Sequence, residues 1–250
     1  MNSLLKSLEI IEAVSEHQPI SLSELSRLLN MPKSSVQRVL VTFQEAGWLR
    51  QTGAETTRWE IGPRVMKVRP AALRGGALYQ AARQPMLDLC NAVNETVYLS
   101  VPDGTNSMVL IDETECKQVV RTSHPIGDLS PFHATANGLA LLAHMREADV
   151  ATILKRDLPK YAENTLSDPV DIRAELQRIR ERGYSVNYGQ YRSAVYAIGA
   201  PVFDAEGVAV ASVCISMPAT RFDSARVDSW GKQVMATAAA IGASPAKVTN

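Results

Sequence analysis

The chain has 250 residues, of which 46% are apolar, and its 26 Lys and Arg residues balance its 26 Asp and Glu residues. This length allows two domains with separate cores, and the composition excludes a strongly basic nucleic-acid-binding protein. The sequence has no run of about 18 apolar residues and no basic N-terminal region followed by an apolar stretch, so we expect a cytoplasmic protein without a membrane span or secretion signal.

An amphipathic pattern near the N-terminus predicts a first helix. Its apolar residues recur at helical spacing and are Leu4, Leu8, Ile11 and Val14. We expect this apolar edge to cover the two helices that follow.

Residues 21–42 predict two further helices joined by a tight turn. Ser21, with Glu24 three residues later, has the capping-box pattern that begins a helix. Asn30 suits the left-handed position at a helix end, and Pro32 suits the start of the next helix. Because the interval between them is short, the two helices must cross at a steep angle. This is the geometry of a helix-turn-helix.

The second of these helices has two distinct faces. An apolar stripe is made of Val36, Val39, Leu40 and Phe43, and the opposite face carries Ser34, Arg38, Val41 and Glu45. Arginine pairs with guanine in the major groove, so Arg38 is the first candidate for base recognition. The candidate DNA-binding residues are Lys33, Ser34, Ser35, Gln37, Arg38, Thr42 and Arg58.

Two strands are predicted directly after this helix, at residues 48–51 and 58–61, around the polar loop 52–57. A hairpin in this position forms the wing of a winged helix-turn-helix, and its Arg50 and Arg58 are placed to reach phosphates.

Net charge does not by itself support DNA binding. Residues 1–63 contain six basic and seven acidic side chains, but residues 25–44 contain three basic side chains and no acidic one. Affinity for DNA depends on where the charges lie, so this distribution is compatible with DNA binding. A helical bundle used for protein contacts is the alternative.

The remainder of the chain predicts a connector and a second domain. Residues 63–92 are mostly helical in pattern, with a break at Gly75 and Gly76. Strands are predicted at 96–101, 107–113, 117–122, 184–190, 195–203 and 207–216, and helices at 135–145, 169–182 and 224–241. Such grouped elements imply an α+β fold on an antiparallel sheet, with helices on one face and a pocket on the other.

The three cysteines indicate neither a disulfide framework nor a zinc site. Cys90, Cys116 and Cys214 are odd in number and lack Cys-x-x-Cys spacing. We interpret them as buried small side chains and expect no metal and no cofactor.

Six blocks of sequence, in order, resemble the IclR family of bacterial transcriptional regulators over essentially the whole chain. They are LLKSLEIIEAV, MPKSSVQRVL, NETVYLSV, PFHATANGLALLA, ERGYSV and AIGAPVFDAEGVAVASVCIS. The resemblance implies a winged helix-turn-helix domain at 1–62 that binds operator DNA, a helical linker at 63–77 used in dimerisation, and an effector-binding domain at 78–250 similar to GAF and PAS domains. It also implies a homodimer or homotetramer, with a repressor favoured over an activator.

The same resemblance places ligand-contacting positions in the second domain. They are Ala136, Asn137, Asn187, Ala197, Cys214 and Ser216. The family commonly has an acid at Asn187, a lysine at Leu139, a cysteine at Ala197 and a glutamate near Gln190. The loss of the acid and the lysine makes the pocket less charged, so a small organic or aromatic acid is the expected effector. Cys214 and Ser216 share one face of a strand, and with the two asparagines they are candidates to hydrogen-bond it.

Two other functions stay open at this point. One is an enzyme with Cys214 as nucleophile and His133 as base, which lacks a visible activating group for the thiol. The other is a sensor or protein-interaction module that has lost DNA binding, against which Arg38, Pro32 and the wing all argue. For a regulator, the effector must bind two arrangements of the subunits with different affinity, and the linker must pass that difference to the DNA-binding helices.

Overall fold

The fold is that of a computed structural model, which describes residues 3–53, 56–67 and 76–243. The chain divides into two compact units, Met1–Gly75 and Gly76–Asn250. Residues 68–75 of the predicted linker lie outside the described residues; before them is a 3₁₀ helix, Pro63–Lys67. Among the described helices, none combines the length and apolar content that a bilayer crossing requires.

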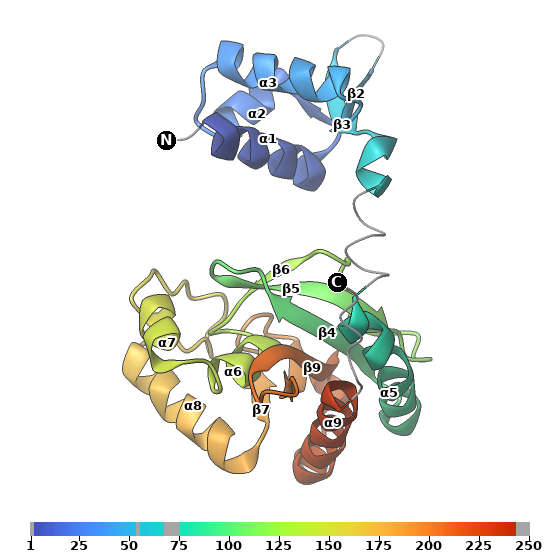
Figure 1. The fold of residues 1–250 in the computed structure, drawn as a ribbon, viewed down its shortest axis with the longest axis vertical. Helices are drawn as coiled ribbons and strands as arrows, with labels where there is room; N and C mark the ends of the chain where they lie inside the picture. Colours follow the sequence, from blue (N-terminus) through green and yellow to red (C-terminus); the bar gives the residue numbers. More distant parts are fainter. Residues whose placement is uncertain (1–2, 54–55, 68–75, 244–250) are drawn as a thin grey trace. The chain divides into compact units, whose positions relative to one another are not determined.

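The N-terminal unit packs helices against a small antiparallel sheet of strand order β1-β3-β2 (Figure 1). Its helices are α1 (Ser3–His17), α2 (Leu22–Leu28) and α3 (Lys33–Glu45), and its strands are β1 (Ile20–Ser21), β2 (Leu49–Thr52) and β3 (Arg58–Ile61). The predicted helix-turn-helix and wing are therefore present. Strand β1 was not predicted, because two residues are too short to show a strand pattern.

Local signals define the helix ends as expected. The Oγ atom of Ser21 accepts a hydrogen bond from the backbone N–H of Glu24 at 3.3 Å, and the Glu24 carboxylate accepts one from the N–H of Ser21 at 2.8 Å. This reciprocal pair confirms the capping box at the start of α2. Asn30 adopts the left-handed conformation after α2, with φ of 48°. Gly47, with φ of +77°, follows the end of α3.

Packing in the N-terminal core agrees with the prediction for α3 but only in part for α1, in which Val14 is buried as predicted and Ile11 packs against the core. Val36 and Leu40 of α3 are fully buried. In α1, however, Leu4 and Leu8 are 63% and 46% exposed, and the buried residues are Ile10, Ala13 and Val14. Leu4 lines a groove between the start of α1 and α3, so the first turn of α1 does not enter the core.

The C-terminal unit is built on a six-stranded antiparallel sheet of order β6-β5-β4-β9-β8-β7. The strands are β4 (Thr96–Pro102), β5 (Ser107–Thr114), β6 (Leu129–Pro131), β7 (Ser185–Tyr188), β8 (Val195–Phe203) and β9 (Ala209–Pro218). The helices are α5 (Ala77–Val93), α6 (Ala136–Leu142), α7 (Glu147–Leu154), α8 (Pro169–Arg182) and α9 (Val227–Gly242). The fold is α+β, as predicted.

Helices cover both faces of this sheet, which corrects the expectation that they cover one. One apolar cluster joins α5 and α9 to alternate strand residues such as Leu99 and Ile215. The intervening residues Tyr98 and Cys214 contact Ala136 of α6 on the other face, and α6, α7 and α8 form a cluster of their own. Figure 1 shows α5 beside α9, apart from α6, α7 and α8.

The strand predicted at 117–122 was wrong, and strand β6 was missed. Residues 117–122 form an irregular segment with Val119 94% exposed. The apolar pattern there is misleading because β4 already pairs with β5 and β9, which leaves no free edge beside it. Strand β6 contains only three residues and includes Pro131, so its sequence shows no strand pattern.

Gly138 in α6 provides a test of how closely this helix approaches the backbone. An alanine Cβ at this position would lie 2.4 Å from the carbonyl oxygen of Phe132. We therefore expect Gly138→Ala to lower the free energy of unfolding, measured by urea titration, by about 1–3 kcal/mol. An unchanged unfolding midpoint would mean that α6 can move away from Phe132 without cost.

Candidate DNA interface and ligand pocket

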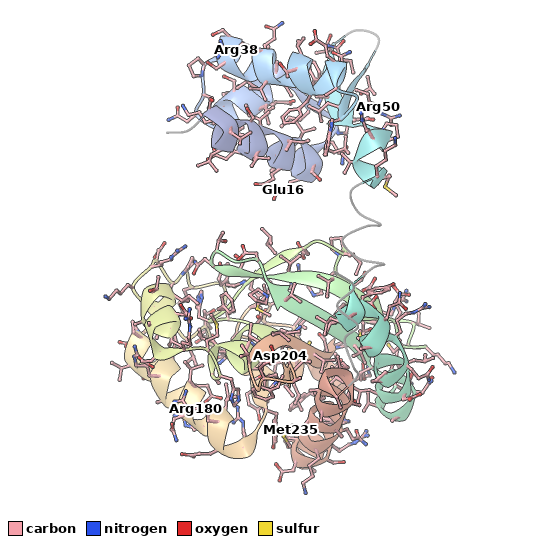
Figure 2. All side chains as sticks on the ribbon, viewed as in Figure 1. Glu16, Arg38, Arg50, Arg180, Asp204 and Met235 are labelled. Atoms are coloured by element: carbon pink, nitrogen blue, oxygen red, sulfur yellow. The ribbon has the colours of Figure 1, made fainter. Side chains whose placement is uncertain are left out.

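The outer face of α3 presents polar and basic side chains to solvent. Lys33, Ser34, Gln37, Arg38 and Thr42 are exposed, whereas Ser35 is half-buried. Figure 2 shows Arg38 on the α3 side of the unit and Glu16 on the α1 side. Within the described residues, neither Lys33 nor Arg38 forms an ion pair, so both charges are available to an external anion.

The acidic residues of this unit are mostly placed elsewhere. Three exposed glutamates, Glu9, Glu12 and Glu16, lie on α1, and Glu45 occupies the last position of α3. The near balance of six basic and seven acidic side chains in residues 1–63 therefore conceals a separation of charges between two helices.

The two arginines of the wing already have partners. The guanidinium of Arg50 lies 2.9 Å from the Glu60 carboxylate across the hairpin. Arg58 donates a hydrogen bond to the carbonyl oxygen of Pro19 at 2.9 Å and lies 3.4 Å from Glu24. A backbone hydrogen bond from Ser21 is the main cause that lowers the pKa of Glu24. Arg58 thus joins β3 to the start of α2, a role that the sequence pattern did not reveal.

In the C-terminal unit, the six predicted ligand positions come together in one cavity of about 90 Å³. Sequence reasoning did not find the remaining lining residues, which are Tyr98, Ser100, Leu110, His124, Asp128, Ser130, Thr135, Tyr191, Arg192 and Val195. The cavity lies between the sheet face opposite α5 and α9, the start of α6, and the segments before β6 and β8.

Strand register explains why these residues meet. Tyr98 of β4 is paired with Cys214 of β9, and Ser216 is paired with Ala197 of β8. Ala197 is in turn paired with Asn187 of β7. Paired residues of an antiparallel sheet point to the same face, so four strands contribute to one wall.

Asn137 at the start of α6 links the two central strands. Its Nδ2 atom donates to the Ser100 hydroxyl at 3.0 Å, and its Oδ1 atom accepts from the Ser212 hydroxyl at 3.0 Å. The neighbouring Cys214 is buried, and burial raises the pKa of its thiol to about 12. The thiol is therefore neutral at physiological pH and is not an activated nucleophile.

Asn187 is also engaged within the protein. Its Nδ2 atom donates to the Ala134 carbonyl oxygen at 2.7 Å and to the Gln190 side chain at 3.0 Å, while its Oδ1 atom accepts from the Gln190 N–H at 3.0 Å. Hydrogen bonds from either asparagine to a ligand thus compete with bonds that brace the pocket wall.

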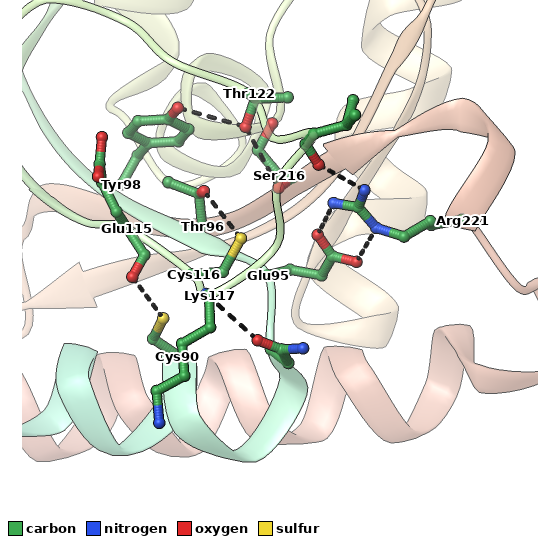
Figure 3. A network of polar contacts seen from close by, with 12 residues as sticks. Cys90, Glu95, Thr96, Tyr98, Glu115, Cys116, Lys117, Thr122, Ser216 and Arg221 are labelled. Carbon is green, nitrogen blue, oxygen red and sulfur yellow. Dashed lines mark hydrogen bonds and ion pairs between the residues drawn. The ribbon is translucent and has the colours of Figure 1, made fainter.

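Two hydroxyl groups support the part of this wall that β4 and β9 form, as Figure 3 shows. The Tyr98 hydroxyl donates to Thr122, and the Thr122 hydroxyl donates to the Ser216 carbonyl oxygen, each at 3.3 Å. Burial raises the pKa of Tyr98, so it remains a neutral donor.

The irregular segment that contains Thr122 is tethered by Arg221. Its guanidinium donates to both carboxylate oxygens of Glu95, at 2.7 and 2.5 Å, and to the Val120 carbonyl oxygen at 2.6 Å (Figure 3). Because the Glu95 side chain is only 7% exposed, this pair is shielded from water. The tether holds the segment from which His124 enters the pocket.

Charged groups gather at the exposed end of the cavity. His124 lies 3.5 Å from the Asp128 carboxylate and packs edge-on against Tyr98. Burial, and then the nearby charge of Arg192, lower the pKa of His124. Arg192 itself is exposed and lies over the Tyr191 ring. Among the residues that the structure describes, Arg192 has no ion-pair partner.

The geometry does not assemble the catalytic pair considered from sequence. His133 is buried, with its Nε2 atom 3.0 Å from the Pro159 carbonyl oxygen, and it does not line the cavity that contains Cys214. In the described part of the chain, no group of three or more His, Cys, Asp or Glu residues is arranged to hold a metal ion.

Comparison with known proteins identifies both units. The family model for the "Bacterial transcriptional regulator IclR C-terminal" matches residues 71–243, and the model for the IclR helix-turn-helix domain matches residues 3–53. The transcriptional repressor IclR of Escherichia coli is 31% identical over 241 residues, which cover 95% of this chain and 88% of that protein. The transcriptional regulator BhcR of Paracoccus denitrificans is 30% identical over 239 residues, covering 95% and 85%.

One solved structure resembles the fold over nearly its full length. It is an IclR homologue from Microbacterium hydrocarbonoxydans complexed with 4-hydroxybenzoate, with a TM-score of 0.77 and 24% sequence identity, and the match covers 96% of this chain and 98% of that one. At this identity the likeness concerns the fold.

Removal of the Arg221 side chain tests the tether. We expect Arg221→Met to lower the free energy of unfolding by about 3–5 kcal/mol, because the Glu95 carboxylate is left buried without a partner. Arg146→Ala is the control, since its ion pair with Asp149 is exposed and its loss should cost less than about 1 kcal/mol. Equal effects in urea titrations would show that the buried pair contributes no more than a surface pair.

Alkylation tests the state of Cys214. Because its thiol is buried and its pKa is raised to about 12, we expect iodoacetamide at pH 8 to leave Cys214 unmodified in the native protein. The same treatment in urea should modify it, as peptide mass spectrometry would show. Rapid labelling of the native protein would contradict this description of the pocket.

Proposed function

The chain belongs to the IclR family of bacterial transcriptional regulators, and we propose that it binds operator DNA through α3 while a small organic or aromatic acid in the C-terminal pocket controls this binding. Its curated relatives are transcriptional regulators, so the chain is a regulator and not an enzyme. Several relatives are named as repressors, which favours repression as its mode of action. Because bacterial operator DNA lies in the cytoplasm, we expect the protein to act there.

The observation that carries the DNA-binding proposal is the exposed face of α3. Arg38 has a long side chain that ends in an unpaired guanidinium. This group can donate two hydrogen bonds to the O6 and N7 atoms of guanine. Ser34, Ser35 and Gln37 flank it as further base or phosphate contacts, and Lys33 is placed for the backbone. The Thr42 hydroxyl already donates to the Arg38 carbonyl oxygen at 2.9 Å, so Thr42 contacts DNA as an acceptor. Arg58 reaches a phosphate only by exchanging its bonds to Pro19 and Glu24.

Specific binding requires more than one copy of the chain. A single helix-turn-helix reads only a few base pairs, and specificity comes from two copies at a fixed half-site spacing. We therefore infer a homodimer or homotetramer, with residues 63–77 as the dimerising linker. A ligand shifts such an assembly only if it binds two arrangements of the subunits with different affinity.

The pocket supports an acid of moderate polarity as the effector. Its inner wall is apolar, with Tyr98, Leu110, Ala136, Ala197 and Cys214 in one buried cluster. A homologue of the same fold binds 4-hydroxybenzoate. An aromatic acid therefore matches both the composition of the wall and the ligand of that homologue.

Replacement of Arg38 tests the assignment of α3 to the major groove. We expect Arg38→Ala to weaken specific binding by roughly 1–3 kcal/mol, because one base contact is lost. The measurement is fluorescence anisotropy at fixed salt with the intergenic DNA upstream of the protein's own gene. Lys33→Ala is the comparison, and should weaken binding to specific and unrelated DNA alike. If the Arg38→Ala variant bound the specific DNA with unchanged affinity, the assignment of α3 to the major groove would be wrong. If the native protein bound none of the DNA fragments, a sensor without DNA-binding activity would be favoured.

A further inference from the structure

The two amide side chains inside the pocket are already paired with other groups of the protein. Asn137 is bonded to Ser100 and Ser212, and Asn187 is bonded to Ala134 and Gln190. The described lining residues of the inner end include no cation. A carboxylate placed there would lose its hydration without gaining a counter-charge, which is unfavourable.

The charged residues that line the cavity all lie at its exposed end. They are His124, Asp128 and Arg192, and they are more exposed than the buried Asn137, Asn187 and Cys214. Asp128 is next to His124, whereas Arg192 has no ion-pair partner within the described residues. A guanidinium binds a carboxylate through two parallel hydrogen bonds, so Arg192 is the group in this cavity best suited to an organic acid.

The size of the cavity limits the part of the ligand that enters it. Its volume of about 90 Å³ is below the roughly 150 Å³ of a protein cavity that accepts benzene. The apolar body of the ligand is therefore small, and a ring enters fully only if side chains at the mouth move. Asp128 adds a negative charge near Arg192, which disfavours a ligand with two carboxylates.

We propose that the effector is a monocarboxylate with a small apolar body, bound with its carboxylate outward on Arg192 and its body against the buried cluster of Tyr98, Leu110, Ala136 and Ala197. This inference rests on the proposed function of the pocket as the effector site. It assigns Arg192, in the turn between β7 and β8, as the residue that selects the charge of the ligand.

The test uses calorimetric titration of the full-length protein with benzoate, benzamide and phthalate. Benzoate should bind most tightly, because benzamide lacks the charge and phthalate adds a second carboxylate. Arg192→Ala should weaken benzoate binding by about 10- to 100-fold and leave benzamide binding unchanged. Arg192→Lys should restore part of the loss. Arg173→Ala is the matched control, since this arginine pairs with Glu147 on the surface and does not line the pocket.

A second variant separates failure of this inference from failure of the proposed function. Ala197→Met fills the inner end of the cavity and should abolish binding of benzoate and benzamide alike. If Ala197→Met abolishes benzoate binding while Arg192→Ala leaves it unchanged, the pocket is the effector site and the role of Arg192 is overturned. If the native protein binds no benzoate at millimolar concentration but still binds its upstream DNA, the ligand class proposed here is wrong and the DNA-binding function stands.

Discussion

The pairing of β4 with β9 at the centre of the six-stranded sheet is the contact on which the C-terminal unit depends. This register places Leu99 and Val213 on the face that packs against α5 and α9, and Tyr98 and Cys214 on the face that lines the pocket. A shift by one residue would exchange the two faces, because strand side chains alternate. Asn137 reinforces the register, since its amide bonds to a serine of each strand.

Most polar side chains around the pocket of this unit form hydrogen bonds within the protein. A buried amide or carboxylate without a partner costs stability, and the groups around the pocket wall have partners within the protein. Asn187 is matched to a turn, and Glu95 to Arg221. The consequence is a firm pocket wall that offers a ligand mainly apolar surface. The charged lining residues His124, Asp128 and Arg192 lie at the mouth of the pocket, where side chains remain exposed to water.

In the N-terminal unit, function depends on the arrangement of charge and not on its sum. The three glutamates of α1 offset three of the six basic residues in a count of the net charge of residues 1–63. They lie on a different helix from Lys33 and Arg38, so the α3 surface remains basic at its start. The capping box of α2 and the bond from Arg58 to Pro19 hold the elements from which this surface is presented.

The features that the sequence alone determined depend on neighbours within a few residues. The capping box at Ser21, the left-handed Asn30, the buried stripe of α3 and the helix Pro169–Arg182 are of this kind, because helix signals act over one or two turns. The six ligand positions inferred from family resemblance also line one cavity, although nothing local in the sequence identifies them.

Tertiary structure alone decided the features that depend on distant contacts. It left Leu4 and Leu8 exposed, because helix packing and not helical spacing selects which residues of α1 enter the core. It left residues 117–122 without a strand, because no sheet edge was free beside β4. It also brought His124 and Arg192 to the mouth of the pocket, and engaged the amides of Asn137 and Asn187 within the protein. Spacing in a sequence cannot show whether a polar atom is free, since its partner can come from any part of the chain.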